Sequence, residues 1–440
     1  MPAPTARWGM TGVGDRLRRV ILLRALAALA VVGVLTGCSA PAAPVPDPTA
    51  TVAKECADAA AKIVAAVGDV VAEYDQPATG TAAPVPGGSG ADAEDPLADA
   101  VASAREIRER LGCQPDAFTA WLEDGLSAIE PEGAIASAVL GRLSASILGT
   151  AREDAGEWVL AEGDDLADAL SRAAEGTTLV LPAGTIEMAD TLVLLDGVTL
   201  RGAGRDATTI RSAATDAALI VVTPGLVRLE DLTVEMTGEH PASGLIAGPT
   251  ASLALTRARI TGGTADADGV GGAGLYLSAQ GDEGSGRGTT LEITESVFER
   301  NSWAGVAVAG GHRVSIQSSS FTGNGEVGIL FLDASSGSVR GSVFADNKVG
   351  LAATGSATPT LLASSVSGGS VGVQVDATAA PVLDGLRISG SSSAAVIFGG
   401  TSAGSITATT CENVPFGIVI GATSAPTVGE NGCPLARGPS

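Results

Sequence analysis

Three stretches of the sequence repeat one pattern: a Ser, an aromatic residue, an Asn, and a Gly inside an apolar run. They read SVFERNSWAGVAV, SSFTGNGEVGILF and SVFADNKVGLAA, and they begin at Ser296, Ser319 and Ser342. The interval of 22 or 23 residues continues to the end of the chain, at Val366, Ile388 and Cys411. A fixed period of this length is typical of stacked structural units, each of which contacts its neighbours, and not of a globular domain.

Each repeat contains about three short apolar strands separated by turns, which predicts one rung of a parallel β-helix. Rungs stack about 4.8 Å apart, so equivalent residues lie directly above one another. We therefore expect the Phe residues to fill the interior as a column and the Asn residues to hydrogen-bond along the axis. A Gly precedes each alternating strand, where we expect it to provide unusual corner dihedrals. These are Gly305, Gly328, Gly350, Gly372 and Gly417.

Residues 176–210, GTTLVLPAGTIEMADTLVLLDGVTLRGAGRDATTI, resemble the N-terminal rungs of right-handed parallel β-helix proteins of the pectate-lyase-like group. The short amphipathic segment at 163–176 resembles the N-terminal cap helix of that group. The resemblance implies a mainly β fold, a right-handed parallel β-helix solenoid over residues 160–433. It implies little about activity, because one fold hosts many functions.

Residues 54–150 predict an N-terminal α-helical domain. Helical periodicity is found in four segments, 54–74, 97–112, 116–129 and 132–149, and a Pro/Gly/Ala-rich loop separates the first two. If the first two helices are antiparallel, Cys56 lies beside Cys113, and we expect a disulfide there. Cys411 and Cys433 are one repeat apart, so we expect a second disulfide between the last two rungs.

The N-terminus predicts export. Arginines precede a short apolar run in residues 1–37, as in a signal peptide, and the run is too short and too interrupted for a permanent transmembrane helix. The run ends in LTGC, which resembles the lipobox of bacterial lipoproteins and implies lipidation of Cys38. A plain secretory signal is the alternative. Residues 38–53 are then a Pro/Ala tether, and the protein is expected on the extracytoplasmic side of the cell membrane.

The chain is strongly acidic, with a formal net charge of −23 and a pI near 4.4. Because a nucleic acid is a polyanion, we expect no nucleic-acid partner. Unassisted binding of an acidic polysaccharide is disfavoured for the same reason.

No catalytic motif of the related enzyme families is found. The Arg/Lys cluster of pectate lyases, the Asp-Asp pair of polygalacturonases and the Asp-Pro-His of alginate epimerases have no counterpart on neighbouring rungs. Glu239, Asp268 and Glu299 are the weak candidates for an acid/base pair of a polysaccharide lyase or glycoside hydrolase. His312 is interpreted as a turn residue rather than a catalyst.

Two rungs are longer than the others, which predicts extra loops at 261–274 and 278–290. Long loops on a rigid scaffold often carry function. Asp266 and Asp268, with Asp282 and Glu283, could supply oxygen ligands to calcium, although loop carboxylates are more often only solvated. We expect no cofactor, with calcium as the alternative.

Aromatic residues near these loops suggest a ligand-binding surface. Tyr276, Trp303 and His240 fall on the same rungs, and an aromatic ring on an outer face can stack on a sugar. The alternative is that Tyr276 and Trp303 only cover local apolar surface.

The Gly-led strands also predict an apolar stripe on the outside of one sheet. We expect the stripe to be covered by the helical domain or to dock a protein partner. Its members are Ile246, Tyr276, Ala307, Leu330, Ala352, Gln374, Ile397 and Val419.

The sequence thus favours non-catalytic binding or presentation at the cell envelope, with glycan as ligand. The alternatives are a polysaccharide lyase or hydrolase, and a structural partner in an envelope protein complex.

Overall fold

The computed structural model describes residues 48–74, 96–222, 225–248, 251–267, 271–277 and 290–437. The described chain forms two compact units, one of helices and one of strands, and each is described by itself. The predicted signal peptide and Cys38 lie outside the described residues.

The helical unit contains five described helices. They are α2 (Pro48–Ala72), α3 (Pro96–Leu111), α4 (Pro115–Ser127), α5 (Ala134–Ile147) and α6 (Leu166–Arg172). The predicted disulfide joins α2 to the residue after the turn that ends α3, with 5.9 Å between the Cα atoms of Cys56 and Cys113. Helix α2 begins at Pro48, six residues before the predicted start, because Pro is tolerated in the first turn of a helix. The tether prediction was therefore too long at its C-terminal end.

Helix α6, predicted as the cap of the solenoid, belongs to the helical unit. The guanidinium of Arg142 on α5 donates hydrogen bonds to the carbonyl oxygens of Ser171 and Ala173, at 3.2 and 2.6 Å. These bonds satisfy carbonyl groups at the C-terminus of α6, which have no partner within the helix.

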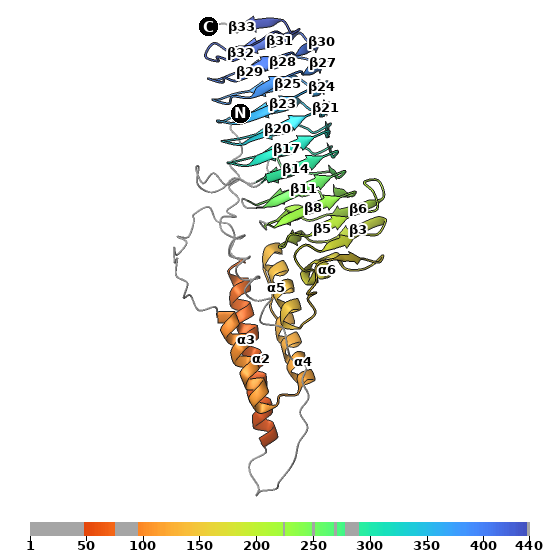
Figure 1. Cartoon of the computed structure of the whole chain (residues 1–440), viewed down its shortest axis with the longest axis vertical. Coiled ribbons are helices and arrows are strands. Elements are labelled where there is room, and N and C mark those ends of the chain that lie inside the picture. Colours follow the sequence, from red (N-terminus) through yellow and green to blue (C-terminus); the bar gives the residue numbers. More distant parts are fainter. Residues whose placement is uncertain are drawn as a thin grey trace. The chain divides into compact units, whose positions relative to one another are not determined.

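The strand unit is a right-handed parallel β-helix, as the sequence predicted. Its strands form three parallel sheets, here called A, B and C, and Figure 1 shows them stacked rung upon rung. Sheet A consists of β1 (Glu157–Val159), β2 (Thr178–Val180), β5 (Thr199–Arg201), β8 (Leu226–Glu230), β11 (Ser252–Thr256), β14 (Thr290–Thr294), β17 (Arg313–Gln317), β20 (Ser336–Arg340), β23 (Thr358–Leu362), β26 (Val382–Asp384), β29 (Ser405–Thr407) and β32 (Thr427–Val428).

Sheet B consists of β3 (Gly184–Met188), β6 (Thr208–Ser212), β9 (Thr233–Met236), β12 (Arg259–Thr261), β15 (Val297–Glu299), β18 (Ser320–Thr322), β21 (Val343–Ala345), β24 (Ser365–Ser367), β27 (Arg387–Ser389) and β30 (Thr410–Glu412). Sheet C consists of β4 (Leu192–Leu194), β7 (Ala217–Val221), β10 (Ser243–Ala247), β13 (Ala273–Leu277), β16 (Ala304–Val308), β19 (Val327–Phe331), β22 (Val349–Ala353), β25 (Val371–Val375), β28 (Ala394–Phe398), β31 (Phe416–Ile420) and β33 (Leu435–Arg437).

The two predicted interior columns are confirmed. The rings of Phe298, Phe321 and Phe344 stack in order, with centroids 5.3 and 5.0 Å apart and interplanar angles of 6° and 15°. The side-chain amides of Asn301, Asn324 and Asn347 form a ladder, with Nδ2 to Oδ1 distances of 2.9 and 3.0 Å. Each of these amides is buried. A buried amide must keep its hydrogen bonds, so the ladder fixes the register of neighbouring rungs.

A third column of buried serines was not predicted. The Oγ atoms of Ser319, Ser342 and Ser364 accept hydrogen bonds from the backbone N–H of Ser296, Ser319 and Ser342, respectively, one rung earlier. These hydroxyls also donate to the carbonyl two residues before them in the chain. The column therefore satisfies backbone groups at the corner between sheets A and B.

The role predicted for the repeated glycines was wrong. Gly305, Gly328 and Gly350 do not have a positive φ; left-handed corner conformations fall on other residues, including Glu295 and Arg300. A Cβ at Gly328 would lie 2.5 Å from the carbonyl oxygen of Gly350 and 2.8 Å from the ring of Phe344. The glycine column is therefore required by close approach of backbone and aromatic ring, and not by dihedral freedom.

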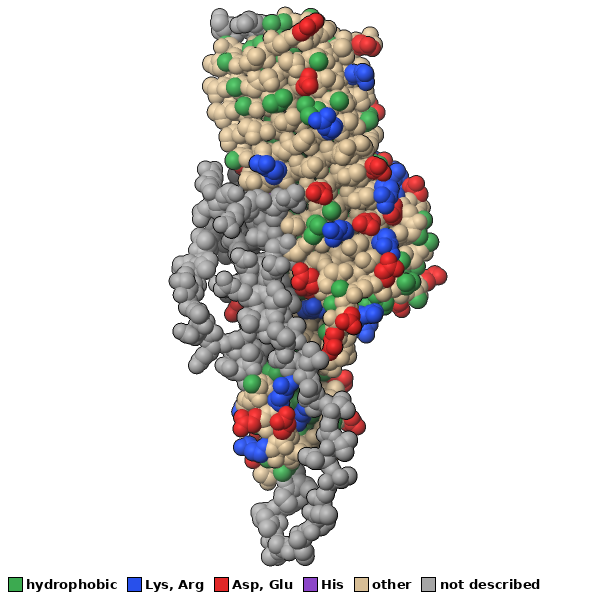
Figure 2. All heavy atoms as spheres, viewed as in Figure 1, with side chains coloured by type: hydrophobic (Ala, Val, Ile, Leu, Met, Phe, Trp, Pro, Cys, Tyr) green, Lys and Arg blue, Asp and Glu red, His purple; other side chains and the backbone are tan. Residues whose placement is uncertain are grey.

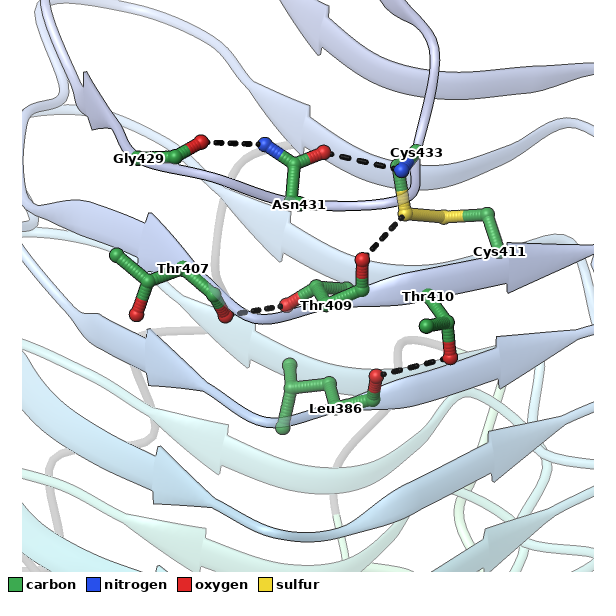
Figure 3. The surroundings of a disulfide bond; sticks show 8 residues. All are labelled: Leu386, Thr407, Thr409, Thr410, Cys411, Gly429, Asn431 and Cys433. Carbon is green, nitrogen blue, oxygen red and sulfur yellow. Dashed lines mark hydrogen bonds between the residues drawn. A yellow bond between two sulfur atoms is a disulfide. The ribbon is translucent and has the colours of Figure 1, made fainter.

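The C-terminal end is closed by the predicted disulfide (Figure 3). Cys411 on β30 is bonded to Cys433, with 5.0 Å between their Cα atoms. Among the described residues the last rung adds β32 to sheet A and β33 to sheet C, but no strand to sheet B. The disulfide connects the last rung to β30 on the side where strand hydrogen bonds are missing.

Replacement of Gly328 by Ala tests the close-packed glycine column. The added methyl group has no free space, so we expect the free energy of unfolding to fall by about 2 kcal/mol or more. Gly311→Ala is the matched control, because a Cβ there would meet nothing within 4 Å. Urea denaturation measures both variants, and equal stabilities for the two would contradict the steric argument.

Candidate functional site

The candidate site is an aromatic pair on the outer face of sheet C. The rings of Tyr276 and Trp303 lie with centroids 6.3 Å apart and are tilted by 53°. Both side chains are half-buried against an apolar cluster that includes Ala304, Ala307 and Leu330. We call Tyr276, Trp303 and these three residues the aromatic patch.

The rung register explains why the pair can form. Tyr276 is paired with Ala307 on the next strand, and Ala307 is paired with Leu330 on the strand after that. Ala304 and Ala307 are fully buried, and their small side chains leave space above β16. Trp303, directly before β16, packs against this cluster and reaches the ring of Tyr276.

The extra loop predicted at 261–274 holds Trp303 in place. The described part of this loop pairs with Ala242 in an antiparallel bridge at Thr264. The backbone N–H of Trp303 donates to the carbonyl of Gly272 at 2.9 Å, and the N–H of Ser302 donates to Gly263 at 2.8 Å. The hydroxyl of Ser302 accepts a further bond from the N–H of Ala265 at 2.6 Å. These hydrogen bonds connect the loop to Ser302 and to the backbone of Trp303.

The other predicted ligand residue, His240, lies on the exposed turn between β9 and β10 with Glu239. This turn is followed directly by Ala242, which pairs with the loop that holds Trp303. The structure therefore brings Tyr276 and Trp303 together and places His240 on a neighbouring turn.

The two described candidate catalytic carboxylates lie on different elements, Glu299 on β15 and Glu239 on the turn between β9 and β10. Glu299 lies on the outer face of sheet B and is ion-paired with Arg300 at 3.1 Å and Arg259 at 3.4 Å. Glu239 is on the exposed turn already described, and no ion pair or hydrogen bond joins the two in the described chain. The third candidate, Asp268, lies outside the described residues.

The predicted calcium ligands are tested only at Asp266, which is exposed on the loop. Asp268, Asp282 and Glu283 lie outside the described residues. Within the described ranges, no group of three or more His, Cys, Asp or Glu side chains could hold a metal ion. In the same ranges no helix is both long and apolar enough to cross a membrane.

His312 follows a turn, as predicted, but its side chain is completely buried. The sequence did not identify this, because a single His after two glycines gives no indication of burial.

Asp333 was missed by the sequence reasoning, although it affects the patch. It is exposed two residues after the end of β19, and its negative charge adds to the effect of burial in raising the pKa of the Tyr276 phenol. Burial is the larger cause, because a phenolate loses hydration in the apolar cluster. No short-range sequence signal links Tyr276 to Asp333, since they are two rungs apart.

The predicted stripe lies on the outer face of sheet C. Its inward neighbours are fully buried, namely Val306, Val308, Ile329, Phe331, Val373 and Val375. Among the outward members, Ile246 and Ala307 are buried, and the members from Leu330 to Val419 are half-buried. What covers the stripe stays a prediction, because the two units are described separately.

The raised pKa of Tyr276 predicts a titration. The chain has two tyrosines, and we expect Tyr276 to ionise at higher pH than the ordinary value of 10.0. The unfolded chain then releases this proton first, so the contribution to stability is intact below pH 10 and falls as the pH rises beyond it. Phenolate absorbance assigns the transition by comparison with Tyr276→Phe. A Tyr276 transition at or below pH 10 would show that the ring is not desolvated.

Comparisons with known proteins agree with the fold. The family model described as "Right handed beta helix region" matches residues 242–385 and 273–433. Curated protein sequences give no match.

Similar solved structures have low sequence identity to this chain. The catalytic domain of a GH87 α-1,3-glucanase in complex with nigerose has a TM-score of 0.49 and 11% identity, over 63% of this chain and 58% of that one. Tailspike protein 2 of Escherichia coli O157:H7 bacteriophage CAB120 has 0.45 and 12%, over 61% and 43%. The A-module of Azotobacter vinelandii mannuronan C-5 epimerase AlgE4 has 0.38 and 15%, over 60% and 89%. This chain therefore spans about half the length of the first two.

Proposed function

We propose that this protein is a lipid-anchored, extracytoplasmic β-helix that binds a glycan at the aromatic patch without cleaving it. The observation that supports the proposal best is the Tyr276–Trp303 pair, half-buried on an outer face and held by a dedicated loop.

The chemistry of the patch suits a sugar ring. A pyranose has an apolar face of C–H groups and polar edges, and an indole or phenol ring matches both, being apolar across its face with one polar group at its rim. The neighbouring half-buried side chain of Leu330 extends the apolar surface, and the exposed Ser302 lies beside Trp303 in sequence. A ligand here can therefore desolvate its ring face while its hydroxyl groups stay in water.

The state of Glu299 supports binding rather than hydrolysis. Glycoside hydrolysis needs two carboxyl groups on either side of the scissile bond, one of them protonated. Oε1 of Glu299 is ion-paired with both Arg259 and Arg300, so it is engaged in contacts of the outer face of sheet B. The alternatives, a polysaccharide lyase or hydrolase, predict cleavage products that depend on Glu239 or Glu299.

Replacement of Trp303 by Ala tests the site. We expect binding of neutral or amino-sugar oligosaccharides to the purified full-length protein to weaken about tenfold, which corresponds to about 1.4 kcal/mol. Phe416→Ala is the matched control, since Phe416 is 56% exposed on the same sheet but far along the stack. Isothermal titration calorimetry measures both.

Unchanged binding in Trp303→Ala would remove the patch from the proposal. The same incubations are analysed for shortened products by chromatography. Products that disappear in Glu299→Gln or Glu239→Gln would replace the binding function with an enzymatic one.

The membrane anchor is tested at Cys38. We expect the wild-type protein to incorporate a palmitate label and to partition with membranes, because two or more acyl chains are needed for stable anchoring. Cys38→Ser should lose both properties and be found in the soluble extracytoplasmic fraction. A labelled or membrane-bound Cys38→Ser protein would contradict the lipid anchor.

A further inference from the structure

The outward column of sheet C that contains Tyr276 continues beyond the aromatic pair and ends, four rungs later, at a polar side chain. The residues that follow Tyr276 in register are Ala307, Leu330, Ala352 and Gln374. Neighbouring strands of a sheet are about 4.8 Å apart, so Gln374 lies about 19 Å from Tyr276 along the stack. The two ends of this column are therefore too far apart for one sugar ring to contact both.

The surface between these two ends is apolar. Leu330 and Ala352 are half-buried, so part of each side chain is open to a ligand. Val349, on the same strand as Ala352, is also half-buried and packs against the same apolar cluster as Tyr276 and Trp303. Removing such a surface from water is favourable. The C–H face of a glycan chain can therefore lie along the column beyond the aromatic pair.

Gln374 is the polar member of this column. Its side chain is half-buried, and its amide makes no hydrogen bond to the described part of the chain. The column becomes apolar again after it, at Ile397 and Val419. A primary amide has two donor hydrogens and an acceptor oxygen, and it is costly to leave them without partners. A sugar hydroxyl, which both donates and accepts, is a suitable partner for this amide.

We propose that the glycan of the aromatic patch is a straight, unbranched chain of about four or more sugars that lies along sheet C from Trp303 to Gln374. This proposal deepens the proposed function and rests on it. Successive units of a β-1,4-linked chain advance in nearly one direction, by a length similar to one rung. An α-1,4-linked chain curves and would leave the column. Gln374 bonds to the far end of the chain and makes affinity depend on chain length.

Oligosaccharides of different length and shape test the proposal on the purified full-length protein by isothermal titration calorimetry. The straight probes are dimers and hexamers of β-1,4-linked glucose and of β-1,4-linked N-acetylglucosamine, and maltohexaose is the curved one. We expect a straight hexamer to bind at least tenfold more tightly than its own dimer. Maltohexaose should bind no more tightly than the dimers, because it cannot follow the column.

Replacement of Gln374 by Leu, which matches the apolar members of the column, tests the far end. Binding of the straight hexamer should weaken about fivefold, the contribution of one hydrogen bond. Binding of the dimer should not change, because a dimer on Trp303 does not reach Gln374. Gln317→Leu is the matched control, since Gln317 is exposed on β17 of sheet A, and it should change neither affinity.

The outcomes separate this proposal from the proposed function. Unchanged hexamer binding in Gln374→Leu, together with weaker binding in Trp303→Ala, would overturn the role of Gln374 and leave the glycan site. Equal weakening of dimer and hexamer by Gln374→Leu, or equal affinity for the straight hexamer and maltohexaose, would also overturn the lengthwise placement. Hexamer binding that is unaffected by Trp303→Ala, or no binding of any probe, would overturn the proposed function itself.

Discussion

The structure depends on one constraint, the exact repetition of backbone positions from rung to rung. Parallel strands pair in register, so each side chain meets its equivalent about 4.8 Å above and below. At that distance a column of side chains can be aliphatic, as for Val306 and Ile329, or it can be flat, hydrogen-bonded or empty. The phenylalanines are flat, with rings 5.0 to 5.3 Å apart. The asparagines and serines are hydrogen-bonded along the axis, and the glycines leave the space empty that the Phe column needs.

The aromatic patch depends on a local departure from that repetition. Strand β13, which carries Tyr276, is preceded by a loop that is longer than the corner turns of later rungs. This loop pairs with the preceding turn at Ala242. The interior columns nevertheless continue through this region, since Oδ1 of Asn301 accepts the N–H of Gly263 at 3.0 Å. The rung can thus lengthen on the outside while its inside stays in register.

The sequence predicted the columns that recur from rung to rung. It did not predict the interactions that individual residues make between rungs. The period identified the Phe and Asn columns, and it placed Cys411 next to Cys433. This was possible because residues that are one repeat apart in the sequence stack on neighbouring rungs. The ion pairs of Glu299 with Arg259, and the effect of Asp333 on Tyr276, depend on rungs of unequal length and had no such signal. The sequence identified the glycine column but not its cause, because a close approach and a positive φ both appear in a sequence simply as a repeated Gly.

The distribution of charge explains why binding would be located on sheet C. On the face shown in Figure 2, acidic and basic side chains gather over the N-terminal rungs and are sparse over the C-terminal ones. Many of the charges on the N-terminal rungs neutralise one another, as Arg211 does with Glu187 and Glu235. The outward positions of sheet C are almost entirely apolar, so a ligand there meets little competing charge.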